Sequence, residues 1–200
     1  YEIGVRLVGS EMCIRDRRET LDAVFASAFG AEDALVRHSF VSGTHALTVG
    51  LFGLLRPGDT LLSLTGSPYD TLEEVIGIRD SGRNDGSLSD WGVQYRQIEL
   101  KNGKIDLVEA ADAAKSAAVA YIQRSRGYSL RPSLSVEEIA EAVRVVKASN
   151  PGILVMVDNC YGEFTERAEP TAAGADLIAG SLIKNPGGGL APIGGYICGT

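Results

Sequence analysis

The sequence predicts an α/β fold in three layers, in which a mostly parallel sheet is covered by helices on both faces. Short runs of β-forming apolar residues alternate with helical patterns from Ala34 to Gly180, and such alternation is typical of parallel sheets. Most of these runs are apolar throughout, as expected of strands that are buried on both faces. One domain is sufficient for 200 residues of which 44% are hydrophobic.

Five segments carry the apolar spacing of helices, and capping residues mark several of their ends. Gly30 is placed to end the first helix as its C-cap, and the RPGD sequence at residues 56–59 ends the second. Ser135 is placed to cap the last helix, where Glu138 completes a capping box. The predicted helices cover residues 18–29, 46–55, 70–79, 106–115 and 136–148.

Seven short segments are predicted to be strands. The segment 93–100 alternates in polarity, which indicates an outer strand. A polar loop at residues 83–90 precedes it, and a turn at residues 101–104 follows it. The predicted strands cover residues 34–40, 60–64, 93–100, 117–123, 153–157, 176–180 and 193–198.

Composition and charge exclude several classes of function. A net charge of −7 without a visible basic face argues against nucleic acid as a partner. No apolar run approaches the roughly 18 residues needed to span a bilayer, so we expect no membrane association. The three cysteines are odd in number and lack metal-ligand spacing, which favours a reducing, cytoplasmic setting and no metal site.

Both ends of the chain are unusual for a domain. Residues 1–17 (YEIGVRLVGSEMCIRDR) have neither the apolar core of a signal peptide nor a pattern that leads into the next helix. They resemble translated adaptor or vector sequence, so we expect a non-native leader and a native fold over residues 18–200. Because the chain stops at Thr200 just after a glycine-rich strand, we also expect an incomplete domain.

Polar residues follow two of the predicted strands where each strand ends. Asp158 follows the apolar run 153–157, and Ser181 and Lys184 follow the run 176–180, just before a glycine-rich loop. Ligand sites of open α/β sheets lie at these carboxyl ends. A lysine that is buried enough to lose its proton forms a Schiff base with a carbonyl. An aspartate in this position also suits the capping of its own loop, and that alternative stays open.

A second candidate site lies where the first predicted strand meets a helix. Ser42, Gly43 and Thr44 form a small-residue turn at a helix start, where free backbone N–H groups bind anions such as phosphate. A simple N-cap made by Ser42 or Thr44 is the alternative. Tyr69 occupies the corresponding junction after the second strand, as a ligand contact or as a packing residue.

A polar cluster follows the strand 117–123. Gln123, Arg124, Ser125 and Arg126 are candidates for ligand contacts because they lie at the end of a buried strand, although exposed arginines often only solvate a loop. His45 suits either the site or packing at the helix start. For Cys160 no activating histidine is indicated, so a nucleophilic role is not expected.

Four motifs resemble those of a known family. The interval between Asp158 and Lys184 is 26 residues, and this pairing resembles the centre of fold-type I enzymes that use pyridoxal 5'-phosphate (PLP). The sequences SGTHA, QRSRGYSLRPS, DNCYGEF and SLIKNPGGG are similar to the methionine gamma-lyase family, which is also described as aluminium-resistance proteins. The resemblance covers residues 18–200 and implies a partial PLP-binding large domain whose C-terminal small domain is missing.

The resemblance also implies roles for individual residues. The PLP phosphate would lie at residues 42–44 and Ser181, while Asp158 would pair with the ring nitrogen. Lys184 would carry the cofactor, and Tyr69 would stack on its ring and serve as an acid. The cluster 123–126 would contact the phenolic oxygen of the cofactor or the carboxylate of the substrate. Family members often carry a hydroxyl two residues after the serine, where this chain has Ile183.

The implied activity is a carbon–sulfur lyase acting on a sulfur amino acid, in a homo-oligomer whose sites draw on two subunits. Another fold-type I reaction, such as that of an aminotransferase or a threonine-aldolase-like enzyme, is the nearest alternative. A PLP-binding protein without turnover is a further one. A nucleotide-binding domain without covalent chemistry is disfavoured because the GxGxxG and GxxxxGK[ST] patterns do not occur.

Overall fold

A computed structural model describes residues 2–79 and 86–200, with side chains from Arg15 onward. The described residues form one seven-stranded sheet in the order β1-β7-β6-β5-β4-β2-β3. Strands β2 to β6 pair in parallel, and β7 is antiparallel to both of its neighbours. The strands are β1 (Asp33–Arg37), β2 (Thr60–Ser63), β3 (Gln94–Gln97), β4 (Val119–Gln123), β5 (Leu154–Asp158), β6 (Leu177–Ser181) and β7 (Gly195–Gly199).

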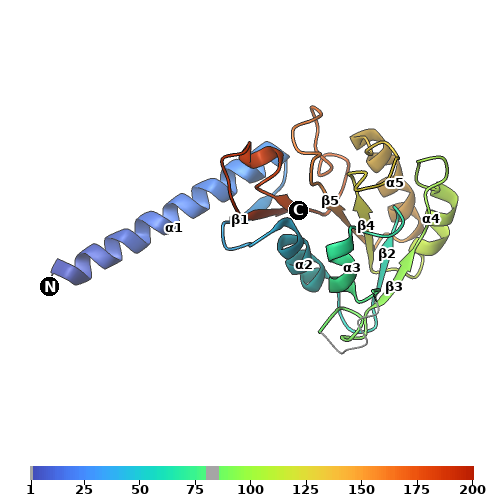
Figure 1. Ribbon diagram of the computed structural model, residues 1–200, viewed down its shortest axis with the longest axis horizontal. Coiled ribbons are helices and arrows are strands. Elements are labelled where there is room, and N and C mark those ends of the chain that lie inside the picture. The colour runs from blue at the N-terminus through green and yellow to red at the C-terminus, as the bar shows by residue number, and fades with distance from the viewer. Residues whose placement is uncertain (1, 80–85) are drawn as a thin grey trace.

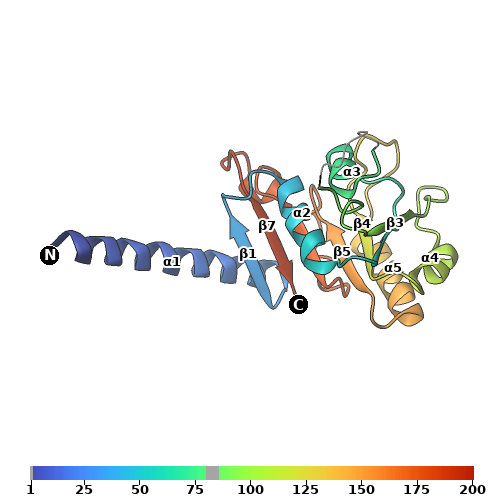
Figure 2. The ribbon, with the colours of Figure 1, turned by 90° about the horizontal axis from the view of Figure 1, so that it is seen from below.

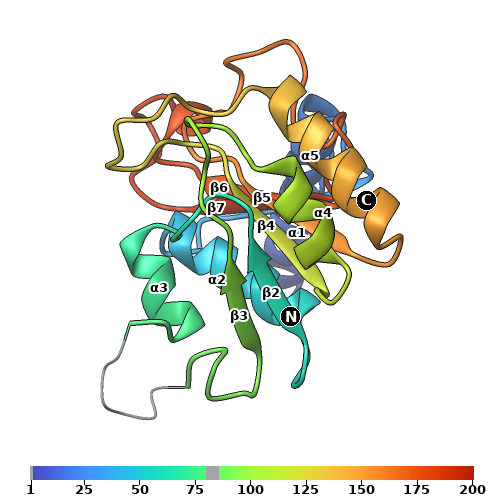
Figure 3. The ribbon, with the colours of Figure 1, turned by 90° about the vertical axis from the view of Figure 1, so that its right-hand side faces the viewer.

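Helices cover both faces of this sheet, which confirms the predicted three layers. Figure 3 shows α2 and α3 on one side and α4 and α5 on the other. The helices are α1 (Glu2–Phe29), α2 (Gly43–Leu54), α3 (Asp70–Ile76), α4 (Leu107–Ala114) and α5 (Val136–Ser149), with a 3-10 turn at Asn185–Gly187. Ser135 and Glu138 make the predicted capping box of α5.

The core divides between the two faces because side chains alternate along each strand. Val155 and Val157 of β5 join a cluster with the last turns of α1 and with α4 and α5. Met156, between them, joins a second cluster with Leu47 and Leu51 of α2 and with α3. The central strands are therefore buried on both faces, as their uninterrupted apolar sequences predict.

The register of the parallel strands aligns their carboxyl ends. Gln123 at the end of β4 is opposite Asp158 at the end of β5, and Asp158 is opposite Ala179 of β6. Ser181 therefore lies two residues further along the same edge. This alignment brings together polar residues that are far apart in the sequence.

Several element ends differ from the prediction. The predicted end of the third helix at Arg79 is wrong: α3 ends at Ile76, because Gly77 adopts a left-handed conformation as its C-cap. The first strand stops at Arg37 rather than residue 40, where its pairing with β7 ends. The outer strand β3 pairs only with the four residues of β2, so it is shorter than predicted. The predicted loop 83–90 lies partly outside the described residues.

The first helix begins at Glu2 rather than Arg18. It extends as a long arm away from the sheet (Figure 1), and its C-terminal end lies next to β1 and β7 (Figure 2). Gly30 ends it with a left-handed backbone, φ 63°. The non-native origin of residues 1–17 stays a prediction. None of the described helices is both long and apolar enough to cross a membrane.

Candidate active site

A cavity of about 550 Å³ opens at the carboxyl edge of the sheet. It is bounded by the ends of β5 and β6, the starts of α2 and α3, and the loop after β4. Nine of the residues selected from the sequence line it, namely Ser42, Gly43, Thr44, Tyr69, Ser125, Arg126, Asp158, Ser181 and Lys184. Gln123 and Arg124 are not among its lining residues.

Asp158 supplies a buried acid to this cavity. Its Oδ1 accepts a hydrogen bond from the Cys160 amide at 3.0 Å, and its Oδ2 accepts one from the Tyr121 hydroxyl at 3.4 Å. Burial raises the pKa of Asp158, while these donors and the charge of Lys184 act in the opposite direction. The negative charge of the carboxylate is thus only partly offset by its donors, and a cationic partner in the cavity would stabilise it.

Lys184 lies half-buried in the wall of the cavity. Its ammonium donates a hydrogen bond to the Tyr161 hydroxyl and lies 4.1 Å from the centre of the Tyr161 ring. An amine and a buried carboxylate therefore share one cavity, although 26 residues separate them in the chain. The two groups meet because β5 and β6 are parallel neighbours in the sheet.

The start of α2 presents free backbone donors to the cavity. Ser42 caps this helix by accepting a hydrogen bond from the His45 amide at 3.1 Å. The amides of Gly43 and Thr44 have no acceptor among the described residues, and both residues line the cavity. Capping and anion binding are therefore compatible at this turn, since different N–H groups serve each purpose.

Gly43 allows the helix start to approach β6 closely. A Cβ atom at Gly43 would lie 2.9 Å from the Cβ of Ser181 and 3.5 Å from the Ser181 amide. Such a contact is too short for any side chain without movement of one segment. Glycine at this position thus lets the α2 amides and the Ser181 hydroxyl bound the same part of the cavity.

Tyr69 lies at the start of α3 and lines the cavity. Its hydroxyl lies 2.9 Å from the hydroxyl of Tyr128, and this contact is the main cause that raises the pKa of Tyr69 to about 12. The Tyr69 amide donates to Oε1 of Gln123 at 2.7 Å. Gln123 therefore lies outside the cavity and holds the backbone of a residue that lines it.

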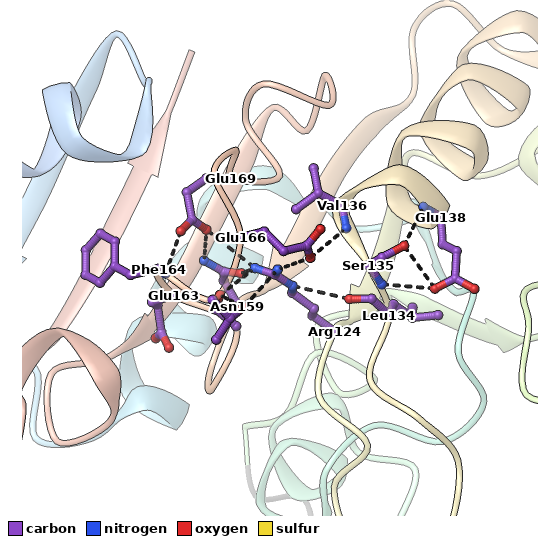
Figure 4. A network of polar contacts seen from close by, with 12 residues as sticks. Arg124, Leu134, Ser135, Val136, Glu138, Asn159, Glu163, Phe164, Glu166 and Glu169 are labelled. Atoms are coloured by element: carbon purple, nitrogen blue, oxygen red, sulfur yellow. Dashed lines mark hydrogen bonds and ion pairs between the residues drawn. The ribbon is translucent and has the colours of Figure 1, made fainter.

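Arg124 is buried in a polar network away from the cavity, contrary to the substrate contact expected for it (Figure 4). Its guanidinium donates to Oε1 of Glu166 at 2.7 Å, to Oδ1 of Asn159 at 2.8 Å and to the Gly162 carbonyl at 2.8 Å. Glu169 accepts from Asn159 at 2.9 Å. Buried arginine needs such partners, and they lie on a loop that follows β5.

Arg126, unlike Arg124, is not buried. It is exposed at the mouth of the cavity and forms no ion pair or side-chain hydrogen bond with the residues that the structure describes. Ser125, next to it, also lines the cavity, and its carbonyl accepts from Arg131 at 2.6 Å. Of the two candidate arginines, Arg126 is the one that is free to bind a carboxylate.

His45 makes packing contacts, whereas Cys160 lines the cavity. The His45 ring packs edge-on against Phe40, and its Nδ1 accepts from the Val41 amide at 3.3 Å. Cys160 lines the cavity, but burial and the charge of Asp158 raise the pKa of its thiol. A thiol in this environment is a poor nucleophile, in agreement with the sequence expectation.

Sequence reasoning missed Tyr161, Tyr128 and Glu163. Tyr161 and Tyr128 line the cavity and contact its lysine and Tyr69, while Glu163 is fully buried close behind it. Tyr161 and Glu163 belong to DNCYGEF, and Tyr128 to QRSRGYSLRPS. The motifs were therefore visible, but the contacts of these side chains depend on the tertiary fold.

Taken together, the mostly parallel sheet and the cavity with Asp158 and Lys184 at neighbouring strand ends define the large domain of a fold-type I enzyme. The chain belongs to the methionine gamma-lyase family, whose model matches residues 15–200. This membership confirms the family predicted from the sequence motifs.

Individual relatives agree with this assignment. The chain is 55% identical over 185 residues to YnbB of Bacillus subtilis, named as uncharacterized, covering 91% of this chain and 44% of YnbB. It is 30% identical over 170 residues to the L-methionine gamma-lyase of Pseudomonas putida, covering 82% of this chain and 36% of that enzyme. A crystal structure of a carbon-sulfur lyase involved in aluminium resistance from Clostridium novyi superposes with a TM-score of 0.87 at 53% identity, covering 92% of this chain and 44% of that one. The chain thus spans less than half the length of these relatives.

Proposed function

We propose that the protein is a PLP-dependent carbon–sulfur lyase that acts on a sulfur amino acid, and that this chain contributes most of its cofactor cavity. The observation that carries the proposal is the placement of Lys184 and the buried Asp158 in one cavity. The names of two relatives, an L-methionine gamma-lyase and a carbon-sulfur lyase, support this class of reaction.

The residues present suit PLP. The free amides of Gly43 and Thr44 and the hydroxyl of Ser181 would hold the phosphate. Asp158, buried beside few donors, would bind the protonated ring nitrogen, which supplies the positive charge that the carboxylate lacks. Lys184 would bind the cofactor covalently through its amine.

Bound PLP supplies an electron sink for the bonds at the substrate Cα. Lys184, freed from the cofactor when the substrate amine takes its place, would take and return the Cα proton at Nζ, because its amine lines the cavity. Tyr69 would donate a proton to the leaving sulfur, since a phenol whose pKa is raised to about 12 stays protonated at neutral pH. Arg126, exposed and unpaired within the described structure, would bind the substrate carboxylate. Thiol release and hydrolysis would then yield an oxo-acid and ammonia.

We propose further that the protein is a homo-oligomer that works in the cytoplasm. Two observations support an additional surface over the cavity mouth: the Tyr128 side chain is 83% exposed and Leu130 is 99% exposed in the same loop. Large apolar side chains of this kind are typical of contacts with another chain or domain.

The reaction is tested on the whole protein that carries this domain, saturated with PLP. Methionine, homocysteine, cystathionine and cysteine are incubated with it, and oxo-acid, ammonia and the released thiol, or sulfide in the case of homocysteine and cysteine, are measured, with Lys184→Ala as the matched control. The proposal predicts thiol or sulfide in an amount equal to the oxo-acid from at least one substrate, and none from the variant. Amino-group transfer to an added oxo-acid, without thiol release, would instead show an aminotransferase.

A further inference from the structure

Tyr161 makes two contacts with the amine of Lys184. The phenol hydroxyl accepts a hydrogen bond from Nζ, and the centre of the ring lies 4.1 Å from the same atom. A cation over an aromatic face is attracted by the negative charge of the ring face. The two contacts together fix Nζ both in distance and in direction.

The ring of Tyr161 does not contribute to the core. Its side chain is 59% exposed and lines the cavity, so burial of apolar area does not explain its position. Its backbone is left-handed, with φ 67°, a conformation that is costly for a residue with a bulky side chain. A conformation of this kind persists only where the surrounding structure enforces it.

The buried network around Arg124 enforces it. Tyr161 lies in the turn formed by residues 159–165, which we call the β5 turn. The Gly162 amide donates to the Asn159 carbonyl at 2.9 Å, and Arg124 binds both the Gly162 carbonyl and the Asn159 side chain at 2.8 Å. Figure 4 shows the contact of Arg124 with Asn159. Together these contacts hold Asn159 and Gly162, which precede and follow Tyr161 in the turn.

Gly162 is essential to this arrangement. A Cβ atom there would lie 2.4 Å from Cδ of Arg124, so only glycine allows the guanidinium to pass so close to the turn. Arg124 is itself held by Glu166 at 2.7 Å. The strained residue is thus fixed by buried charged groups on one side, while its side chain faces the cavity on the other.

We propose that Tyr161 is the positioning residue of Lys184: whenever the amine is not covalently engaged, the phenol holds it at a fixed place in the cavity wall near Asp158. The function of this contact rests on the role given to Lys184 above. The proposal also gives the buried Arg124 network a function: by holding the β5 turn, the network positions Tyr161 and, through Tyr161, the amine.

The test measures the accessibility of the Lys184 amine in the full chain without PLP. The wild type, Tyr161→Phe and Tyr161→Leu are reductively methylated with isotope-coded formaldehyde, and the rate at each lysine is read by peptide mass spectrometry. Lys115 is the internal control, because it is exposed and pairs with Asp112 far from the cavity. The reagent must displace the amine from the phenol before it reacts.

The proposal predicts that Lys184 reacts roughly fivefold faster in Tyr161→Phe, which lacks only the hydroxyl. In Tyr161→Leu, which also lacks the ring face, the increase is roughly tenfold or more. An unchanged Lys184 rate in Tyr161→Phe overturns the proposal, and so does an increase that Lys115 shares, because this would report a loosened fold. Since no cofactor is present, the result does not depend on whether the protein is a PLP enzyme.

Discussion

The hydroxyl of Tyr196 donates a hydrogen bond to Oε1 of Glu163 across 2.9 Å, and both side chains are fully buried. The other carboxyl oxygen, Oε2, has no partner in the part of the chain that the structure describes. Burial, with Asp158 and Glu169 nearby, raises the pKa of Glu163 from its ordinary 4.5 to about 7. The site therefore has a second titratable acid behind Asp158.

Replacing Glu163 by glutamine should flatten the dependence of stability on pH. Because the folded protein binds this proton more tightly than the unfolded chain, the stabilisation is complete below pH 4.5 and is lost as the pH rises to about 7. In the wild type this change lowers the free energy of unfolding by an amount on the order of 3 kcal/mol, and Glu163→Gln should not show it. Urea unfolding at pH 5 and pH 8 measures it. Equal pH dependence in both proteins would contradict the assigned pKa.

Asparagine at position 158 should stabilise the protein without cofactor. The raised pKa of Asp158 shows that its ionised form is disfavoured by burial, and a neutral amide avoids this cost. We expect the melting temperature of Asp158→Asn to be higher by about 3 °C at neutral pH, with a smaller difference in acid. Added PLP should raise the melting temperature of the wild type more than that of the variant. If PLP raised the melting temperature of Asp158→Asn more than that of the wild type, this would argue against a cationic partner for Asp158.

The two arginines of the loop after β4 should behave oppositely when each is changed to methionine. Arg124→Met removes the buried guanidinium that Glu169 and Asn159 bind, so we expect a loss of about 3 kcal/mol or more in the free energy of unfolding. Arg126→Met should leave stability within about 0.5 kcal/mol and weaken substrate binding, seen as a raised KM. Chemical denaturation and steady-state kinetics separate the two effects. A stable Arg124→Met protein would refute the structural role.

Phenylalanine at position 128 should lower the pKa of Tyr69. The Tyr128 hydroxyl, 2.9 Å away, is the main cause of the raised value of about 12, and its removal returns Tyr69 toward its ordinary 10. Tyrosine labelled with carbon-13 at Cζ reports this titration by NMR, with Tyr69→Phe to assign the signal. No change in the Tyr69 titration would show that the hydroxyl contact does not persist in solution.

The sequence predicts the parts of the site that depend on strand order alone. Asp158, Ser181, Lys184 and the turn at residues 42–44 each follow an apolar run. Because parallel strands end on the same edge of a sheet, these residues meet once the strands are parallel. The cavity that collects them follows from this geometry.

The remaining parts depend on contacts that no local pattern reveals. The carboxylate partners of the buried Arg124 are Glu166 and Glu169, which lie 42 and 45 residues further along the chain. The side chain of Gln123 binds the backbone of Tyr69 and does not line the cavity. The left-handed conformation of Tyr161 is likewise imposed by the β5 turn. Each is a tertiary effect on a residue that the sequence places at a strand end.

The role proposed for Lys184 is the covalent binding of PLP. The whole protein that carries this domain is mixed with PLP, its visible absorption is recorded, and the complex is reduced with borohydride and mapped by peptide mass spectrometry, beside Lys184→Ala. We expect a visible band that reduction abolishes, a pyridoxyl group on Lys184 alone, and no band in the variant. A folded wild-type protein that shows no band, or that carries the label on other lysines, would contradict it.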